Sequence, residues 1–391
     1  MPWKAKNVEE QRYEFIRQWR AGGSSVSELC REYEISRQTA YKWRERFQRG
    51  RLAGLQNRPH DPKEVPGRTS WLWLQRLRRE RKRRPTWGAR KLRWSLERDF
   101  GRKGAPSAAT IGRWLRRWGL TPGRRRRLRG PLLTRMSVRP ARSANEVWTV
   151  DFKGWYRTGD GRRVEPLTVR DLHSHYSFCV RLLKRQCLLA TKREMQRLFR
   201  RYGLPKRIRC DNGTPFGGGG PTGLTRLSAW WVKLGIAVEF ITPGRPCENG
   251  SHEQFHRVYK KEVARKPAYR MGDQQRRSNQ WLRDYNGGRP HESLGMSPPR
   301  RHYRKSRRKM PMKPQPWEYR KGWKRCWVKG NGEICWRGTR RYVGEAFVRD
   351  YVGLKPVRQG VWRVYFGPVL VGELWEHETG SIRMAKYRRK R

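Results

Sequence analysis

The chain has 391 residues, enough for two or three domains that each bury a hydrophobic core. Lysine and arginine total 94 and aspartate and glutamate 33, which gives a formal net charge of +61. Self-repulsion of this size is tolerable when a polyanion neutralises it, and the 20 tryptophans exclude a wholly disordered basic tail. The composition therefore predicts folded domains that bind nucleic acid.

Neither a signal region nor a membrane span is predicted. The first residues are not apolar, and no stretch reaches the ~18 uncharged apolar residues that a spanning helix needs. The seven cysteines are scattered and contain no C-x-x-C, so we expect no disulfide framework and no structural zinc site. We therefore expect a cytoplasmic protein without a membrane partner; a cationic protein of the membrane surface is the weaker alternative.

Three short helices are predicted over residues 8–49. Apolar side chains recur three apart over 9–20, Ser25 begins a capping box that opens a second helix, and Ser36 caps a third. This is the pattern of a helix-turn-helix, whose last helix would turn Trp43 inward. It would expose four candidates for contact with bases or phosphates: Arg37, Gln38, Thr39 and Lys42.

The pattern of the third helix recurs further along the chain. The spacing Ser-x-x-Thr-x-x-Lys-Trp from Ser36 returns as Ser-x-x-Thr-x-x-Arg-Trp from Ser107, after two more helical patterns. A second helix-turn-helix is therefore predicted over 68–120, with Thr110 and Arg113 as candidate DNA contacts. Coincidence among common capping and basic residues is the alternative.

From residue 145 the pattern changes to strands. Three strand patterns follow one another between 147 and 183, and helical and strand patterns then alternate as far as residue 265. This order predicts a mixed sheet with helices on its faces. Short strands with Gly and Asn turns follow residue 326 and predict a small β-barrel.

The chain is thus predicted to be a multidomain α+β protein. Two segments rich in Pro, Gly and Arg, without periodicity, read as basic linkers whose arginines lie in solvent or along phosphates. The predicted parts are a helix-turn-helix at 1–55, a second at 68–120, a linker at 121–144, an α/β core at 145–300, a linker at 301–325 and a barrel at 326–385.

Three acidic residues are the candidates for chemistry. Asp151 lies inside an apolar strand, Asp211 ends another strand before a turn, and Glu253 follows a loop rich in Pro and Gly. Singly, each reads as a cap or an ion-paired residue. If they cluster, their repulsion requires cations, for which Mg²⁺ or Mn²⁺ is suited. Two such ions catalyse in-line phosphoryl displacement.

Several further motifs accompany these acids in a fixed order. They are Ser36-Arg37-Gln38-Thr39-Ala40-Tyr41-Lys42-Trp43, Trp148-Thr149-Val150-Asp151-Phe152, Cys210-Asp211-Asn212-Gly213, LSAWWVKLGI at 227–236, Pro243-Gly244-Arg245-Pro246 with Asn249-Gly250-x-x-Glu253, and Tyr285-Asn286-x-x-Arg289-Pro290-His291-x-x-Leu294-Gly295. The ordered set, which covers most of the chain, resembles insertion-sequence transposases with a retroviral-integrase-like core.

The resemblance implies an RNase H-like core in which Asp151, Asp211 and Glu253 hold two Mg²⁺ or Mn²⁺ ions, with Lys260 contacting DNA near the scissile phosphate. It implies recognition of terminal inverted repeats by the helix-turn-helix pair, phosphodiester cleavage, and attack of the freed 3′-OH on target DNA without a nucleotide cofactor. It further implies a homo-oligomer on double-stranded DNA, located in the bacterial cytoplasm on the nucleoid.

Three alternatives stay open. Glu248 is an alternative third acid, because its distance in sequence from Asp211 is closer to the common spacing of this superfamily. His252-Glu253-Gln254-Phe255-His256 satisfies H-E-x-x-H, which in a zinc metallopeptidase places two His ligands and a Glu base on one helix. The third alternative is a catalytically inactive DNA-binding regulator or transposase relic.

Overall fold

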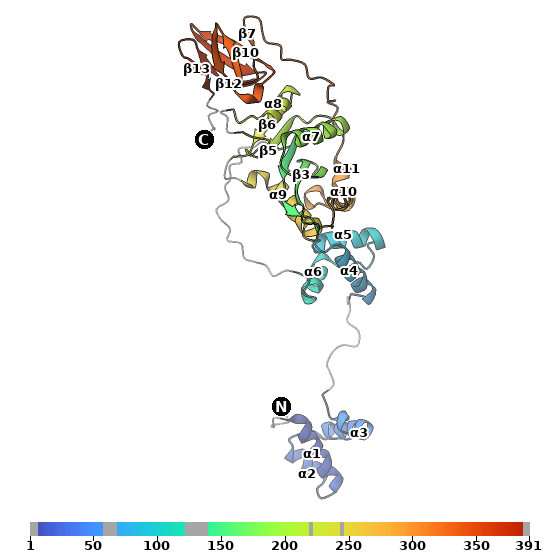
Figure 1. The fold of residues 1–391 in the computed structure, drawn as a ribbon. Coiled ribbons are helices and arrows are strands. Elements are labelled where there is room, and N and C mark those ends of the chain that lie inside the picture. Colours follow the sequence, from blue (N-terminus) through green and yellow to red (C-terminus); the bar gives the residue numbers. More distant parts are fainter. Residues whose placement is uncertain (1–6, 58–68, 122–139, 219–221, 243–245, 386–391) are drawn as a thin grey trace. The chain divides into compact units, whose positions relative to one another are not determined.

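The computed structural model describes residues 7–57, 69–121, 140–218, 222–242 and 246–385 (Figure 1). Met1–Thr69 and Ser70–Arg391 form two compact units, each described by itself below. Most of the predicted linker at 121–144, residues 219–221 and the first three residues of the Pro243-Gly244-Arg245-Pro246 motif lie outside the described residues. Within the described part, no helix is long and apolar enough to cross a membrane. The six described cysteines are free thiols.

The first unit is a three-helix module. Its helices are α1 (Val8–Ala21), α2 (Val26–Glu32) and α3 (Arg37–Gly54). The predicted capping box of α2 is present at Ser25, and the Ser36 hydroxyl accepts the Thr39 amide 3.1 Å away. Trp43 is buried in the core, as predicted. The predicted helices are confirmed. Their caps could be predicted locally because each capping side chain bonds to an amide only three residues away.

A second three-helix module begins the other unit. It consists of α4 (Trp71–Arg83), α5 (Ala89–Phe100) and α6 (Ala108–Arg117) around a core of its own. Ser107 caps α6 by accepting the Thr110 amide at 3.1 Å, and its hydroxyl lies 3.0 Å from the Thr110 hydroxyl. Since the Ser36 cap has the same pattern, the repeat is confirmed at the level of helix capping.

A six-stranded mixed sheet follows, as predicted. Its strands are β1 (Val147–Phe152), β2 (Tyr156–Arg157), β3 (Arg163–Asp171), β4 (Ser177–Leu183), β5 (Arg207–Cys210) and β6 (Ala237–Phe240). β1, β3 and β4 pair antiparallel, whereas β1, β5 and β6 pair parallel. The C-terminal ends of β1 and β5 therefore meet at one edge of the sheet.

Helices cover both faces of this sheet (Figure 1). Trp148 and Val150 of β1 join a core with α7 (Leu188–Tyr202) and α8 (Arg226–Lys233). Thr149 points to the other face, where its hydroxyl contacts α9 (Gly250–Tyr259), and Phe255 of α9 packs with α10 (Met271–Gly288). Because side chains alternate along a strand, Asp151 lies on the α9 side with Thr149.

The first part of the predicted basic linker at 301–325 is hydrogen-bonded to the sheet domain. It follows η3 (Glu292–Leu294) and includes the end of α11 (Pro299–His302). The Arg308 guanidinium donates to the carbonyls of Pro205, Leu234 and Gly235. The expectation that the arginines of this linker all lie in solvent or on phosphate is wrong for Arg308, because its guanidinium is hydrogen-bonded to these three carbonyls.

The C-terminal region forms two sheets and no closed barrel within the described residues, so the barrel prediction is wrong. One sheet has the order β14-β12-β11-β10-β7 and the other β13-β9-β8. β7 pairs with β10 and β8 with β9, so the ladder is broken between β7 and β8, and both sheets cover a shared core. The strands are β7 (Lys324–Trp327), β8 (Glu333–Trp336), β9 (Thr339–Tyr342), β10 (Tyr351–Arg358), β11 (Val361–Phe366), β12 (Val369–Trp375), β13 (Gly380–Ser381) and β14 (Arg383–Met384), with η4 (Glu345–Phe347) between β9 and β10.

Candidate active site

Asp151 and Asp211 lie side by side at the edge where two parallel strands end. The register of β1 and β5 pairs Val147 with Arg207 and Thr149 with Arg209. Continued by two residues, this register sets Asp211 beside Asp151. Within the described residues, Asp211 Oδ1 is buried and has no hydrogen-bond partner. An orphaned carboxylate oxygen next to a second carboxylate is a site prepared for a cation.

Glu253 reaches the same edge from a different element. It is exposed and lies in the first turn of α9, the helix that covers the Asp151 side of the sheet. Glu253 and Asp211 both raise the pKa of Asp151 by electrostatic repulsion. The three acids predicted from the sequence are therefore brought into one electrostatic neighbourhood.

The charge state of Asp151 reflects this crowding. Burial, followed by repulsion from Asp211, raises the pKa of Asp151 to about 7. Burial also raises the pKa of Asp211. Lys153 is half-buried beside them, and the pKa of its ammonium is lowered by burial and by repulsion from Lys260. Lys153 therefore lies near Asp151, and Lys260 lies near Lys153.

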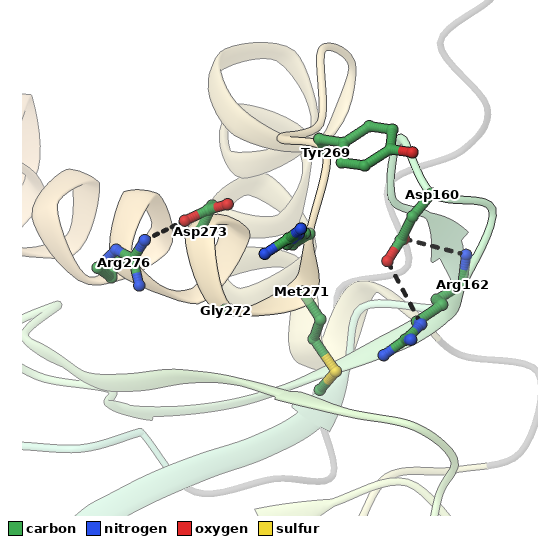
Figure 2. A pocket seen from close by; sticks show the side chains of 8 residues that line it. Asp160, Arg162, Tyr269, Met271, Gly272, Asp273 and Arg276 are labelled. Carbon is green, nitrogen blue, oxygen red and sulfur yellow. Dashed lines mark hydrogen bonds and ion pairs between the residues drawn. The ribbon is translucent and has the colours of Figure 1, made fainter.

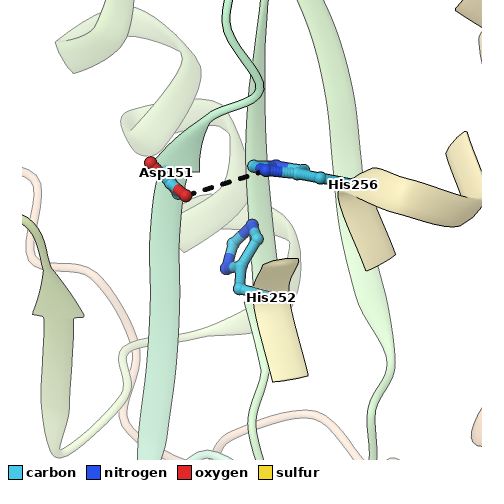
Figure 3. A group of neighbouring side chains, drawn as sticks. All are labelled: Asp151, His252 and His256. Carbon is cyan, nitrogen blue, oxygen red and sulfur yellow. Dashed lines mark ion pairs between the residues drawn. The ribbon is translucent and has the colours of Figure 1, made fainter. Parts of the chain in front are cut away.

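Two histidines of α9 lie behind Asp151 (Figure 3). His252 is fully buried and His256 nearly so, and both Nε2 atoms contact the Thr168 hydroxyl, at 2.6 Å and 2.7 Å. His252 Nδ1 lies 2.8 Å from the Thr149 hydroxyl, whereas His256 Nδ1 lies 3.7 Å from Asp151 Oδ2. Asp151, His252 and His256 form a group whose ligand atoms lie within 4.8 Å of one another, so a possible metal-binding group is present.

The H-E-x-x-H reading of this helix has a specific difficulty. In that motif the two histidines and zinc meet at a common point. Here the common point of both Nε2 atoms is the hydroxyl of Thr168. Burial lowers the pKa of His256 to about 3 and the pKa of His252 well below its usual value, so both rings are neutral, hydrogen-bonded groups of the interior. Both Nε2 atoms are used by Thr168, and the metallopeptidase stays a hypothesis.

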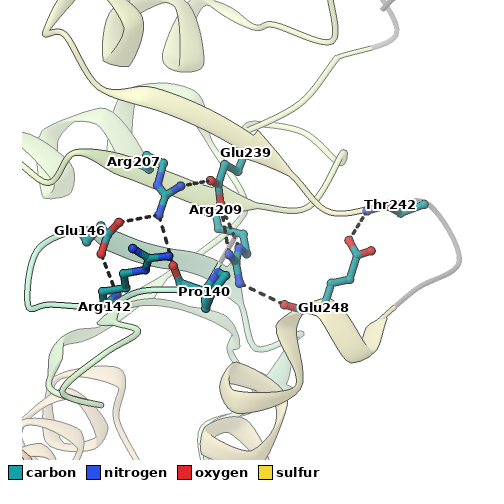
Figure 4. A network of polar contacts seen from close by, with 8 residues as sticks. All are labelled: Pro140, Arg142, Glu146, Arg207, Arg209, Glu239, Thr242 and Glu248. Carbon is teal, nitrogen blue, oxygen red and sulfur yellow. Dashed lines mark hydrogen bonds and ion pairs between the residues drawn. The ribbon is translucent and has the colours of Figure 1, made fainter. Parts of the chain in front are cut away.

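Glu248 belongs to a different network (Figure 4). It lies buried on η1 (Pro246–Asn249), and its carboxylate accepts the Thr242 amide at 2.8 Å. Its carbonyl accepts from Arg209, which in turn pairs with Glu239 at 3.2 Å. Glu248 therefore fixes the segment that leads into α9.

The candidate DNA contacts are accessible in both helical modules. Arg37, Gln38 and Lys42 are exposed on α3, and Thr39 is half-buried against the Ser36 cap. On α6, Arg113 is exposed and donates to the half-buried Thr110 hydroxyl at 3.3 Å. Lys260 is exposed where α9 passes into the π-helical η2 (Lys260–Ala264). Their roles in DNA binding stay predictions.

A pocket of about 640 Å³ lies away from the three acids, between the turn that precedes β3 and the start of α10 (Figure 2). Its two acids are already paired. Asp160 bonds with Thr158 and Arg162, and Asp273 forms an ion pair with Arg276. This arrangement holds the turn and the helix start and leaves no free carboxylate for chemistry in this pocket.

Three residues of the site were missed by reasoning from the sequence. Thr149 and Lys153 stand two positions on either side of Asp151, so the alternation of a strand could have placed them on the same face. Thr168 faces Asp151 only through the pairing of β1 with β3, and no local signal marks it. The contact of His256 with Asp151 likewise depends on the packing of α9.

Comparison with known families assigns the modules. Residues 11–63 match a helix-turn-helix domain, 39–115 a homeodomain-like domain, 141–246 and 234–299 an integrase core domain, and 324–378 the C-terminal domain of IS481 family transposases. The homeodomain-like match extends from α3 to α6, the two helices that share the Ser-x-x-Thr cap.

Two curated relatives come from insertion elements. The insertion element IS407 uncharacterized 31.7 kDa protein of Burkholderia multivorans is 28% identical over 58% of this chain and 77% of its own length. The insertion element IS476 uncharacterized 39.2 kDa protein of Xanthomonas euvesicatoria is 28% identical over 45% of this chain, and the match spans about half of that protein.

Among solved structures, the simian T-cell lymphotropic virus intasome in complex with PP2A regulatory subunit B56 gamma contains a similar chain. The two share 15% identity at a TM-score of 0.36, over 60% of this chain and 80% of that one.

Proposed function

We propose that this chain, which is an insertion-sequence transposase with helix-turn-helix domains and an integrase core, cleaves the ends of its element and joins the freed 3′-OH to target DNA. The observation that carries the proposal is that Asp211 and Glu253 both act electrostatically on Asp151 at one edge of the sheet, where Lys153 also acts on it. Crowded acids beside cationic side chains suit a reaction on the sugar–phosphate backbone.

The acids fit two divalent ions, Mg²⁺ or Mn²⁺. Asp211 Oδ1 is buried without a hydrogen-bond partner. Burial and, after it, repulsion from Asp211 raise the pKa of Asp151, and bound cations would relieve that repulsion. When bound, such ions activate an attacking oxygen and stabilise a leaving oxygen in a phosphoryl displacement. Asp151 and Asp211 hold them at the sheet edge, and Glu253 completes the set from α9.

Positive charge around the site would position the DNA. Lys153 lies near Asp151 and Lys260 lies near Lys153, and their ammonium groups would contact phosphates near the scissile bond. The exposed residues of α3 and α6 recognise the terminal inverted repeats, and the two C-terminal sheets hold the DNA backbone. Because two ends must be held together, the active form is a homo-oligomer on double-stranded DNA, at work on the nucleoid in the bacterial cytoplasm.

The test is strand transfer by the purified full-length chain on DNA that carries its own element ends. We expect D151N and E253Q to abolish product while end binding persists. E248Q is the matched control, because Glu248 holds the η1 segment through the Thr242 amide. Thermal denaturation confirms that each variant is folded.

The outcomes separate the candidate functions. Strand transfer that survives in D151N would sink the assignment of the acids. End binding without any metal-dependent cleavage by the wild type would identify a DNA-binding regulator or relic. Peptide cleavage that depends on zinc and on His252 would identify a metallopeptidase.

A further inference from the structure

The two histidines behind Asp151 use their ring nitrogens differently. Thr168 has one hydroxyl hydrogen, and the structure directs it to the Asp151 carbonyl at 2.9 Å. Its oxygen can then only accept from the two Nε2 atoms that lie 2.6 Å and 2.7 Å away. Both rings therefore carry their proton on Nε2.

This protonation leaves each Nδ1 with a lone pair. His252 Nδ1 accepts from the Thr149 hydroxyl at 2.8 Å, so that ring is fully used. His256 Nδ1 lies 3.7 Å from Asp151 Oδ2, which is too far for a hydrogen bond. A nitrogen lone pair and a carboxylate oxygen thus face one another across a short gap (Figure 3).

The ring is nearly buried and the carboxylate half-buried, so these two electron-rich atoms repel each other unless a proton or a metal ion lies between them. A gap of 3.7 Å can be bridged by one ion, since metal bonds to oxygen and nitrogen are about 2.1 Å each. The opposite nitrogen of His256 donates to Thr168, as the second nitrogen of a metal-binding histidine donates to a fixed acceptor.

We infer that His256 Nδ1 is a direct ligand, together with Asp151, of one of the divalent ions of the proposed active site. His252 is a positioning residue, which holds Thr168 and through it the ring of His256. The inference rests on the proposed metal-dependent function and names a nitrogen ligand in a site otherwise predicted to be made of carboxylates.

A nitrogen ligand changes which cation the site prefers. Imidazole suits transition-metal ions, whereas Mg²⁺ takes oxygen ligands almost without exception. With His256 as a ligand, the ratio of the Mn²⁺ affinity to the Mg²⁺ affinity is larger than in a site made of carboxylates alone. Replacing His256 lowers this ratio.

The experiment is pulsed electron paramagnetic resonance of Mn²⁺ bound to the full-length protein. We expect an echo modulation from directly bonded ¹⁴N in the wild type, and its replacement by a ¹⁵N signal when only histidine is labelled with ¹⁵N. H256Q should lose the nitrogen signal, because glutamine can still donate to Thr168 but has no Nδ1. We expect H256Q to bind Mn²⁺ roughly tenfold more weakly and Mg²⁺ with a smaller change.

H252N tests which ring is the ligand: it removes the positioning contact with Thr168, but His256 keeps its own bond to Thr168, so the nitrogen signal should remain even if Mn²⁺ binds more weakly. H256N replaces H256Q if the latter does not fold. A wild-type complex without histidine coupling overturns the inference, as does coupling that persists in H256Q. D151N separates the two proposals. If Mn²⁺ binding requires Asp151 but shows no nitrogen, the inference fails and the proposed function stands; if no Mn²⁺ binds, both fail.

Discussion

The helical modules and the mixed sheet differ in where their polar side chains find partners. Ser36 and Ser107, which cap α3 and α6, bond to amides three residues away. The arginines and lysines of these helices are exposed except for Arg46, which lies over Trp43. At the sheet edge, His252 bonds to Thr149 and Thr168, which come from two other elements distant in the chain.

This difference teaches how each region tolerates change. A cap is one local bond at the surface, and its loss costs about 1 kcal/mol. A buried imidazole or carboxylate depends on partners brought by other elements, and removing one leaves the others unsatisfied. Substitutions at the sheet edge should therefore affect function and stability more than substitutions of comparable size in the helices.

The largest effect is expected from D211N, which removes a charge from the buried pair at the sheet edge. We expect strand transfer to fall by roughly a thousandfold, because metal-assisted charge stabilisation contributes several kcal/mol. Binding to element ends should stay within about twofold. Single-turnover kinetics measure strand transfer, and an electrophoretic assay measures binding to element ends. Equal losses in both would refute the assignment of catalysis to the sheet region and of end binding to the helical modules.

The next effect is an acid sensitivity confined to the sheet region. His175 and His291 stack at 5.5 Å, and burial lowers the pKa of His175 to about 4 and that of His291 further. Below pH 6.5 the unfolded chain takes up protons that the folded chain refuses, so stability present above pH 6.5 is lost as the pH falls toward 4.

We expect this loss to approach 1.4 kcal/mol per pH unit for each histidine. Urea unfolding between pH 7 and pH 4, followed by tryptophan fluorescence, measures the free energy of unfolding. H175Q should flatten the pH dependence. An unchanged slope in that variant would show that other groups carry the acid sensitivity.

A smaller effect is expected from the exposed cations of the two helical modules. K42A and R113A should each weaken binding to element ends by about tenfold and lower the salt dependence of log K by about 0.9, which corresponds to one phosphate contact. Fluorescence anisotropy at several salt concentrations measures both changes. If a variant changes neither the affinity nor its salt dependence, the substituted residue does not contact DNA.

The smallest effect tests whether the two modules are equivalent. S36A and S107A each remove the same cap, so each should destabilise its own module by about 1 kcal/mol. Thermal unfolding monitored by circular dichroism compares the two with the wild type. If the two losses of stability differ by more than twofold, the repeated cap does not stabilise the two modules equally.

Some of the candidate site was accessible from the sequence and some was not. Asp151 and Asp211 could be chosen because each interrupts or ends an apolar strand, and Glu253 because it opens a helix. The spacing of His252 and His256 suggested a zinc motif as an alternative, whereas their shared contact with Thr168 could be found only in the structure. The closed barrel was wrong because strand pairing between distant segments leaves no local pattern.

By itself, the sequence determined the helices with their caps, the order of the strands and the basic charge that demands a polyanion, since each depends on neighbouring residues or on composition. Only the tertiary structure decided that β1 and β5 end together, that Glu248 belongs to the Arg209 network, and that His256 Nδ1 faces Asp151. Those relations join segments far apart in the chain, and folding alone brings them within bonding distance.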